Sequence, residues 1–455
     1  METFDLLVLG GGPGGYLCAE RAAQKGMKVA LFEKRALGGT CLNEGCIPTK
    51  TLLHSAKLYR HAKDGSEFGV TAKSLTYDHA KVIDRKNSVV KTLVGGVASA
   101  MKANKVTVIT GEAVIRGKEE SGFSVVCDET VYTGKRLVLA TGSETTMPPV
   151  PGLKEGLQSG FVVTNREVLD DKKLPEHMVV IGGGVIGLEM AYYFASVGVR
   201  ITVIEMMPKI AGATDPDICD LLMKDCISRG MDFKLSCKVL EIKKNAVCYE
   251  ENGKKQEITC DRVLLSAGRR PATAGYGIEH LNVETDRGAI VTDRHMCTTV
   301  SGVYAVGDCN GKLMLAHTAY REAEVAVNHM TGIADEMRYD AVPAVIYTDP
   351  EVASAGLSAE EAKQQGYDVR EVRLPMVYAG RYVAETGDGK GFIKLVADRK
   401  SNRLLGCQMV GSYASELIIT PVMMIETQLS PERLKKIVFP HPTVAEIIRE
   451  ALFQL

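Results

Sequence analysis

The feature that most constrains this chain is a strand, a glycine-rich turn and a helix that lead to an acidic residue. Residues 4–9 are apolar and predict a buried strand. The turn after them contains Gly10, Gly12 and Gly15, and a helix and a second strand are predicted before Glu33. Such a unit places a helix N-terminus against a pyrophosphate and a carboxylate against ribose hydroxyls. The pattern therefore predicts a dinucleotide site.

The same pattern occurs again in the middle of the chain. Residues 178–181 predict a strand, the turn contains Gly182, Gly184 and Gly187, and the next predicted strand ends at Glu205. The first glycine and the acid are separated by 23 positions in both copies. Two copies predict two bound dinucleotides and an α/β fold with two Rossmann-like domains.

Two cysteines, Cys41 and Cys46, follow the first glycine-rich unit and are five positions apart. On a regular helix they would not share a face, so a bridge between them requires a turn, which Gly45 permits. Pro48 fits the first turn of a following helix, whose dipole favours a thiolate. A zinc site would need two more ligands nearby, and this segment offers none. We interpret the pair as redox-active.

The place of these cysteines predicts which cofactor each unit holds. FAD exchanges electrons with both thiols and nicotinamides, so FAD is predicted in the first unit. A later strand ends at Asp308, an acid placed to bind a polyol hydroxyl. The segment 314–317 then opens a predicted helix, whose N-terminus would stabilise negative charge on a reduced flavin.

The second unit is predicted to hold NAD. Glu205 stands at its ribose end and is followed by Met206 and Met207, with no arginine. A carboxylate in this position binds the ribose hydroxyls of NAD and repels the 2′-phosphate of NADP.

The length of 455 residues exceeds one ordinary core, so several domains are expected. Three prolines within 147–152 indicate a connection between the two nucleotide-binding units. We predict an FAD-binding domain at 1–147 and 272–340, an NAD-binding domain at 148–271 and an α+β domain at 341–455. In the last domain we predict strands near 344–347, 392–397 and 404–410 and helices near 358–365, 412–427 and 443–452.

Charge and composition exclude some partners. The chain has 55 basic and 56 acidic residues and no dominant basic tract, so neither nucleic acid nor a membrane surface is an expected partner. No uncharged apolar run reaches the length of a membrane span. The twelve cysteines are scattered and no secretory signal precedes the first strand, so we expect a cytoplasmic protein.

A candidate acid-base pair lies near the C-terminus. His441 precedes a predicted helix whose first turns contain Glu446. A histidine can accept a thiol proton near neutral pH, and a carboxylate can orient its ring and stabilise the charged form. Taken alone, His441 could equally be a turn residue before Pro442. Because it lies far along the chain from the cysteines, a partner subunit could supply it.

These motifs resemble those of the dihydrolipoamide dehydrogenases, a branch of the pyridine nucleotide-disulfide oxidoreductases. The segments GGTCLNEGCIPTK, GGGVIGLE, GVYAVGDC, MLAHTA, VIYTDPEVA and HPTVAE occur in the family's order over essentially the whole chain. The resemblance implies oxidation of protein-bound dihydrolipoamide with reduction of NAD+, in a homodimer with one FAD per subunit. The third domain would be the dimerisation domain. The lipoyl group would arrive on a carrier protein of a 2-oxoacid dehydrogenase complex or of the glycine cleavage system.

The resemblance also implies a role for each reactive side chain. Cys41 would exchange with the substrate, and Cys46 would face the flavin. Lys50 would lie near the flavin and pair with Glu189, although an exposed surface pair is the simpler interpretation of those two residues. His441 of one subunit would deprotonate the dithiol bound at the other.

The resemblance implies further cofactor contacts in the glycine turns and at the strand ends near them. For FAD these are Gly10, Gly12, Pro13, Gly14, Gly15, Glu33, Lys34, Gly39, Thr40, Cys41, Lys50, Ala113, Thr141, Gly142, Ser143, Gly307, Asp308, Met314, Leu315, Ala316 and His317. For NAD they are Gly182, Gly184, Val185, Ile186, Gly187, Glu189, Glu205, Val239, Ala267 and Gly268. No metal site is predicted.

The sequence departs from the family pattern at two places. Glu44 lies between the cysteines where an apolar residue is usual, and we expect its carboxylate to raise the thiolate pKa. Phe439 and Pro440 precede His441 where a further histidine is common. A reductase of another disulfide, glutathione-like or protein, is the alternative enzyme. A non-catalytic flavoprotein is the alternative of another class, and the retained cysteines and histidine argue against it.

Overall fold

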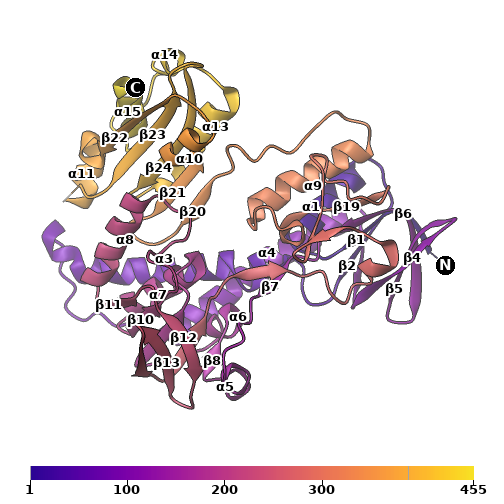
Figure 1. Cartoon of the computed structure of the whole chain (residues 1–455), viewed down its shortest axis with the longest axis horizontal. Helices are drawn as coiled ribbons and strands as arrows, with labels where there is room; N and C mark the ends of the chain where they lie inside the picture. The colour runs from indigo at the N-terminus through magenta and orange to yellow at the C-terminus, as the bar shows by residue number, and fades with distance from the viewer. Residues whose placement is uncertain (1, 388) are drawn as a thin grey trace.

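The computed structural model describes residues 2–387 and 389–455, which form three units, each built around its own β-sheet. Figure 1 shows the first unit at the right, the second at the lower left and the third, in orange and yellow, above the second. The predicted fold class, two Rossmann-like units and a C-terminal α+β unit, is confirmed. The domain boundaries themselves stay a prediction.

The first unit has a mixed seven-stranded sheet in the order β3-β2-β1-β6-β5-β4, with β19 also paired to β6. Its strands are β1 (Glu2–Leu9), β2 (Val29–Glu33), β3 (Thr107–Thr110), β4 (Ala113–Glu119), β5 (Gly122–Cys127), β6 (Thr130–Leu139) and β19 (Val303–Ala305). Helices α1 (Pro13–Gln24) and α9 (Ala316–Met330) contribute buried alanines to the same hydrophobic core as β1. The segment after residue 300 therefore returns to the first unit, because β19 extends this sheet.

The second unit has a parallel five-stranded sheet in the order β11-β10-β9-β15-β8. Its strands are β8 (Val162–Val163), β9 (His177–Ile181), β10 (Arg200–Ile204), β11 (Met231–Lys234) and β15 (Arg262–Leu265). Helices α7 (Val185–Ser196) and α8 (Pro216–Ser228) connect β9 to β11 through β10, and β12 (Lys238–Ile242), β13 (Ala246–Glu251) and β14 (Lys254–Thr259) form a separate antiparallel sheet.

The sequence repeat is also a repeat of topology. The order β3-β2-β1-β6 in the first unit corresponds to β11-β10-β9-β15 in the second. In both units, antiparallel strands (β4 and β5 in the first, β12 to β14 in the second) come just before the strand that pairs with the central one. That strand is β6 beside β1 and β15 beside β9. The glycine turn therefore follows the central strand of each sheet, where the strand order reverses and open α/β sheets bind their ligands.

A short ribbon joins the two nucleotide-binding units. Strand β7 (Ser143–Thr145) follows β6, and β16 (Arg269–Pro271) follows β15. The two pair antiparallel, with Arg269 opposite Thr145. The ends of both sheets are thus brought to one place between the units.

The third unit has an antiparallel five-stranded sheet in the order β20-β21-β24-β23-β22. Its elements are β20 (Ala344–Ile346), β21 (Val352–Gly356), α10 (Ala359–Gln364), β22 (Val369–Pro375), α11 (Gly380–Thr386), β23 (Phe392–Asp398), β24 (Arg403–Val410), α12 (Ala414–Leu417), α13 (Ile419–Thr427), α14 (Pro431–Leu434) and α15 (Glu446–Gln454). A core that includes Ile393, Leu395, Ile447 and Ile448 fastens α15 to the sheet.

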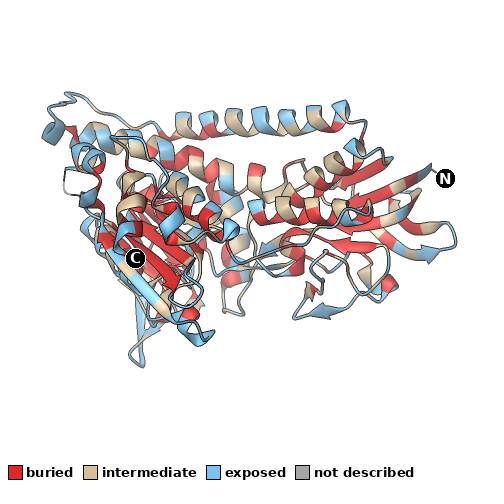
Figure 2. Cartoon of the chain, turned by 90° about the horizontal axis from the view of Figure 1, so that it is seen from above, coloured by how far each residue is buried: buried red, intermediate tan, exposed pale blue. Residues whose placement is uncertain are grey.

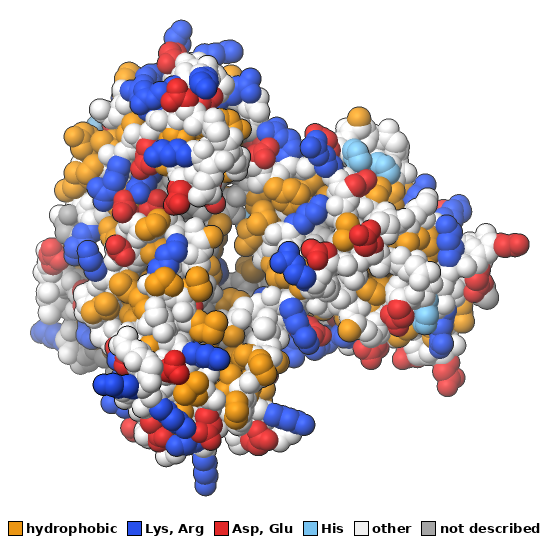
Figure 3. All heavy atoms as spheres, viewed as in Figure 1, with side chains coloured by type: hydrophobic (Ala, Val, Ile, Leu, Met, Phe, Trp, Pro, Cys, Tyr) orange, Lys and Arg blue, Asp and Glu red, His pale blue; other side chains and the backbone are white. Residues whose placement is uncertain are grey.

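The third unit is tied to the second by ion pairs of the buried Lys394. The Lys394 ammonium lies 2.9 Å from Asp215 and 2.7 Å from Asp217, at the start of α8. The space-filling view shows a hollow between the third unit and the first (Figure 3).

The remaining helices and turns connect these sheets. They are α2 (Gly39–Asn43), α3 (Cys46–Asp64), α4 (His79–Ala103), α5 (Leu153–Ser159), α6 (Asn165–Val168), the strands β17 (Thr285–Asp286) and β18 (Ala289–Ile290), and the 3-10 turns η1 (Gly65–Phe68), η2 (Ile278–Leu281), η3 (Gly307–Asn310) and η4 (Met376–Tyr378). The long helix α4 packs against α3 and exposes much of its outer side (Figure 2).

Two expected helices of the third unit were wrong in extent. The helix expected at 412–427 is two helices, α12 and α13, divided at Ile418. Pro421 explains the break, because its ring would clash with the carbonyl of Leu417 in a continuous helix. The helix expected at 443–452 begins at Glu446, after a turn that contains His441.

Among the described residues, no helix combines the length and the apolar character that a membrane span requires.

Candidate active site

The two glycine turns have nearly the same geometry. A Cβ on Gly10 would lie 2.2 Å from the Ala140 carbonyl oxygen, and a Cβ on Gly182 would lie 2.4 Å from that of Ser266. Only glycine fits the first position of each motif, because a side chain there would clash with the carbonyl oxygen that follows the neighbouring strand. The third is required by the turn itself, since a Cβ on Gly15 would lie 1.7 Å from the Gly10 oxygen.

The middle glycines are not explained by the fold. Gly12 and Gly184 both have φ near −75°, which any residue adopts. A Cβ on Gly184 would meet nothing within 4 Å, and one on Gly12 only the Gly39 Cα at 3.8 Å. Neither helix N-terminus has a side-chain cap, so first-turn N–H groups of α1 and α7 can donate to a bound group. These cradles fit the pyrophosphate of a dinucleotide.

The acids at the ends of β2 and β10 make matching hydrogen bonds. Glu33 accepts from the N–H of Gly11 at 2.7 Å and of Arg35 at 2.7 Å. Glu205 accepts from the N–H of Gly183 at 2.6 Å and of Met207 at 2.7 Å. Each carboxylate is thus fixed beside its glycine turn, with acceptor capacity left for ribose hydroxyls.

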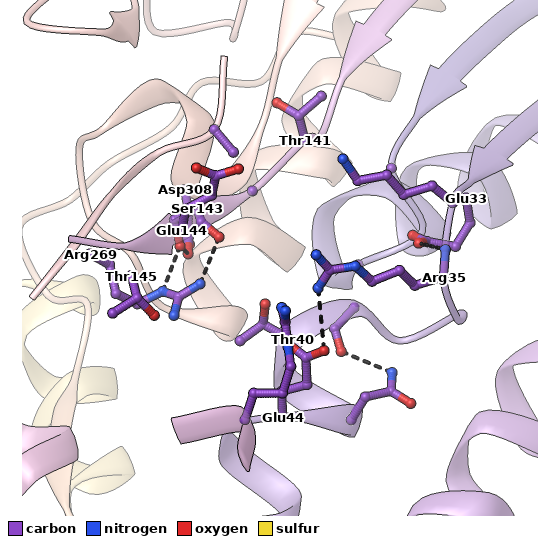
Figure 4. A pocket seen from close by; sticks show the side chains of 18 of the residues that line it. Glu33, Arg35, Thr40, Glu44, Thr141, Ser143, Glu144, Thr145, Arg269 and Asp308 are labelled. Carbon is purple, nitrogen blue, oxygen red and sulfur yellow. Dashed lines mark hydrogen bonds and ion pairs between the residues drawn. The ribbon is translucent and has the colours of Figure 1, made fainter. Parts of the chain in front are cut away.

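A cavity of about 450 Å³ lies against the first glycine turn and extends to the ribbon between the units (Figure 4). Of the residues predicted to contact FAD, it is lined by Gly10, Gly12, Glu33, Lys34, Gly39, Thr40, Ala113, Thr141, Gly142, Ser143 and Asp308. The cavity therefore collects residues from β1, β2, β4 and β6 and from the end of β19, although they are far apart in the sequence.

The sequence interpretation missed several cavity residues, of which Arg269 is the most consequential. Its guanidinium donates to the hydroxyl of Ser143 at 2.7 Å and to the Ser143 carbonyl at 2.6 Å. The Ser143 hydroxyl in turn donates to Asp308. The sequence places Arg269 only within the predicted NAD-binding domain, and its position in the cavity depends on the pairing of β16 with β7.

Other predicted residues lie outside the cavity lining. Pro13, Gly14 and Gly15 begin α1 beneath the turn, and Gly307 begins η3. Neither cysteine, nor Lys50, nor 314–317 lines the cavity, and His317 is bound to the Pro343 carbonyl at 2.8 Å. In the second unit, Val239 is buried in the core and Ala267 and Gly268 follow β15. Val185 and Ile186 form the exposed first turn of α7. Their contacts to cofactors stay predictions.

The predicted turn between the two cysteines is present. Cys41 lies in the short helix α2, which ends before Glu44, and Cys46 is the first residue of α3 with Gly45 as its N-cap. Cys41 is half-buried and Cys46 is exposed. Pro48 lies in the first turn of α3, as predicted.

The two thiols have opposite shifts in pKa. A hydrogen bond to Cys46 and burial raise the pKa of Cys41. The hydrogen bond from Cys41 is the main cause that lowers the pKa of Cys46 to about 7, and the Lys50 ammonium adds to it. Cys46 is therefore the thiolate of the pair near neutral pH.

Lys50 and Glu189 are an ion pair between the two units. The Lys50 ammonium lies 2.8 Å from the Glu189 carboxylate, whose side chain is only 4% exposed. Glu189 also accepts the N–H of Tyr347 at 2.9 Å, and Lys50 lies over the Tyr347 ring. The interpretation of this pair as a solvated surface contact was therefore wrong.

The Glu44 carboxylate between the cysteines is paired with two arginines. Its carboxylate lies 2.8 Å from the Arg166 guanidinium and 3.4 Å from that of Arg35. Glu44 is not among the main causes of the pKa shift of either cysteine. Two cations compensate its charge, so we no longer expect it to raise the thiolate pKa.

His441 and Glu446 form the predicted pair. The Nδ1 atom of His441 lies 2.9 Å from a Glu446 oxygen, and the other oxygen accepts the N–H of Thr443 at 3.0 Å. These two contacts, with Thr443 the larger cause, lower the pKa of Glu446. The His441 side chain is 78% exposed on the third unit. Because Nδ1 is bound to Glu446, Nε2 is the ring nitrogen left to act on a substrate.

Within the described residues, no group of three histidine, cysteine or acidic side chains has the arrangement of a metal site.

Two family models match the chain. That of the pyridine nucleotide-disulphide oxidoreductases covers residues 4–323, and that of their dimerisation domain covers 342–452. The latter match supports a homodimer.

Curated relatives match over nearly the full length. The chain is 37% identical over 474 residues to the dihydrolipoyl dehydrogenase of Rhizobium etli, covering 99% of this chain and 98% of that protein. It is 38% identical over 456 residues to that of Chlamydia muridarum, covering 99% and 96%.

Among solved structures, the Cu(II) complex of the HOCl-induced flavoprotein disulfide reductase RclA from Escherichia coli has a TM-score of 0.87 and 27% identity, with 100% of both chains covered. LpdA from Mycobacterium tuberculosis, at 23% identity, a TM-score of 0.89 and coverage of 100% of this chain and 99% of that one, supports the fold alone. With both family models matched and the paired cysteines at the start of α3, the chain belongs to the pyridine nucleotide-disulphide oxidoreductases.

Proposed function

We propose that this protein oxidises protein-bound dihydrolipoamide to lipoamide and reduces NAD+ to NADH, with FAD as the bound cofactor. The observation that carries the proposal is the Cys41–Cys46 turn at the start of α3, beside the ion pair of Lys50 and Glu189. The identity to dihydrolipoyl dehydrogenases over 99% of the chain supports the choice of substrate.

The cofactor sites follow from the two glycine turns. FAD would occupy the cavity beside Gly12, with Glu33 at its ribose and Asp308 at its polyol chain. NAD+ would bind at Gly184, with its ribose at Glu205. When bound, FAD would transfer the electron pair from the reduced cysteines to NAD+.

The thiol chemistry requires a base and two distinct cysteines. His441 of one subunit accepts a proton from the dithiol bound at the other, and Glu446 stabilises the charged ring. The resulting thiolate attacks the Cys41 sulfur of the Cys41–Cys46 disulfide, and the bond to Cys46 breaks. The second substrate sulfur then displaces Cys41, which leaves lipoamide and two reduced cysteines. The low pKa of Cys46 makes it the better leaving group.

Two features support a base supplied by the partner. His441 is largely exposed, and the third unit matches a dimerisation domain. The third unit also exposes apolar side chains near His441, among them Ile437 and Val438, the latter 90% exposed. We propose that the partner covers this surface. The lipoyl carrier would belong to a 2-oxoacid dehydrogenase complex or the glycine cleavage system, and we place the reaction in the cytoplasm.

A substrate comparison tests the proposal. The purified protein with FAD should reduce NAD+ with dihydrolipoamide much faster than it oxidises NADH with oxidised glutathione. Activity with oxidised glutathione but not with dihydrolipoamide would instead favour a reductase of another disulfide. The similarity to the disulfide reductase RclA is the reason to test this alternative. No turnover with either substrate would favour a non-catalytic flavoprotein.

A further inference from the structure

Glu44, the unusual residue between the redox cysteines, is held by two other segments. Its carboxylate binds Arg166 at 2.8 Å and Arg35 at 3.4 Å. Its backbone carbonyl accepts a hydrogen bond from the Asn165 amide at 2.7 Å. Asn165 and Arg166 begin α6 in the second unit, whereas Arg35 follows β2 in the first. The contacts therefore connect the cysteine turn to both nucleotide-binding units.

These four residues all line the cavity that would hold FAD. Figure 4 shows Arg35 and Glu44 joined by an ion pair within the pocket, with Thr40 beside them. The Glu44 side chain is 20% exposed, whereas those of Arg35 and Arg166 are 55% and 47% exposed. The carboxylate thus lies inward and the two guanidiniums lie toward solvent.

We propose that the ion triad of Glu44, Arg35 and Arg166 is a clasp that retains FAD in its cavity. The inference rests on the proposed function, because it assumes FAD in this cavity. The three residues line the cavity from both nucleotide-binding units, so their contacts join two parts of its wall. Loss of these contacts would let the two parts separate more easily and a bound dinucleotide leave faster.

The size of the effect follows from the exposure of the pairs. Partly exposed ion pairs contribute about 0.2–1 kcal/mol each, so loss of both contacts should accelerate FAD release by about two- to thirtyfold. Salt screens such pairs, so the clasp should weaken as ionic strength increases.

The test measures FAD release from the holoenzyme, followed as free flavin fluorescence after dilution with a flavin-binding scavenger. The variants are Glu44→Gln, Arg166→Gln and the double variant. Glu257→Gln is the matched control, because it removes the ion pair with Lys243 on the surface of the second unit. We expect Glu44→Gln, which loses both contacts, to release FAD about two- to thirtyfold faster, and Arg166→Gln, which loses one, up to about fivefold faster. The double variant should release FAD no faster than Glu44→Gln. Release from the unmodified protein should increase with salt, and release from Glu44→Gln should not.

Other outcomes would overturn the clasp. Unchanged or slower release from Glu44→Gln would mean that Glu44 only neutralises the arginines. Additive effects in the double variant would mean that Arg166 holds FAD independently. The proposed function is tested separately by the FAD content and dihydrolipoamide turnover of the unmodified protein, so its failure is distinguishable from failure of the clasp.

Discussion

The Lys50 ammonium lies 2.8 Å from the Glu189 carboxylate, so the cysteine helix α3 is joined to the glycine helix α7 of the second unit. Lys50 lies one turn after Cys46 and is among the groups that lower its pKa. Glu189 is buried and also accepts a hydrogen bond from the N–H of Tyr347. The pair therefore links the Cys46 thiolate to the second unit through Glu189, and Glu189 in turn links it to the third unit through the N–H of Tyr347.

Removal of this cation should raise the pKa of Cys46. In the unmodified protein the pKa is lowered to about 7, so the thiolate forms as the pH rises through neutrality. In Lys50→Met the pKa should move toward the ordinary thiol value of about 8.5. At pH ~7.5, alkylation of Cys46 by iodoacetamide should then slow by up to about eightfold. The rate is read for the Cys46 peptide by mass spectrometry in the reduced protein, and an unchanged pH profile would show that Lys50 does not act on the thiol.

A change at Glu44 should have little effect on the same titration. Its carboxylate is paired with Arg35 and Arg166, and it is not among the main causes of the pKa shift of either cysteine. We therefore expect the alkylation profile of Glu44→Val to match that of the unmodified protein within about 0.3 of a pH unit. A midpoint displaced to lower pH would restore the view that Glu44 acts on the thiolate.

Glu205 should determine the preference for NAD+ over NADP+. Its carboxylate is fixed by the N–H groups of Gly183 and Met207, and like charges placed together cost several kcal/mol. We expect kcat/KM for NAD+ to exceed that for NADP+ by at least about 100-fold. Glu205→Ala should raise KM for NAD+ and lower the ratio of kcat/KM for NAD+ to kcat/KM for NADP+. Both are measured at a constant dihydrolipoamide concentration. Equal ratios in the two proteins would exclude Glu205 from the ribose site.

Loss of the proposed base should affect only the thiol half-reaction. His441→Gln should lower dihydrolipoamide-dependent NAD+ reduction by about 10²–10⁴-fold. NADH oxidation with ferricyanide does not require the thiol base and should be nearly unchanged, which serves as the control for folding and FAD content. A parallel loss of both activities would point to a structural role.

Much of this arrangement could be predicted because its signals are local. The glycine spacing and the acids at Glu33 and Glu205 are fixed by one strand, one turn and one helix. The cysteine turn likewise needed only Gly45 and Pro48. Where the chemistry depends on adjacent residues, spacing along the sequence is sufficient.

The rest depends on contacts between distant segments. Arg269 enters the cavity only because β16 pairs with β7, and the partners of Glu44 come from two other segments. The burial of Glu189 depends on the packing of all three units. The divided helix at Ile418 could have been predicted from Pro421, because the proline rule is local.

The central claim is that one active site combines the cysteines of one subunit with the base of its partner. Mixing equal amounts of the inactive variants Cys41→Ser and His441→Gln, with dissociation and reassociation, tests it most directly. Half of the dimers should then be mixed, and each mixed dimer should have one complete site. Dihydrolipoamide-dependent NAD+ reduction should recover to about a quarter of that of the unmodified protein. No recovery, in mixtures shown to contain mixed dimers, would contradict the account.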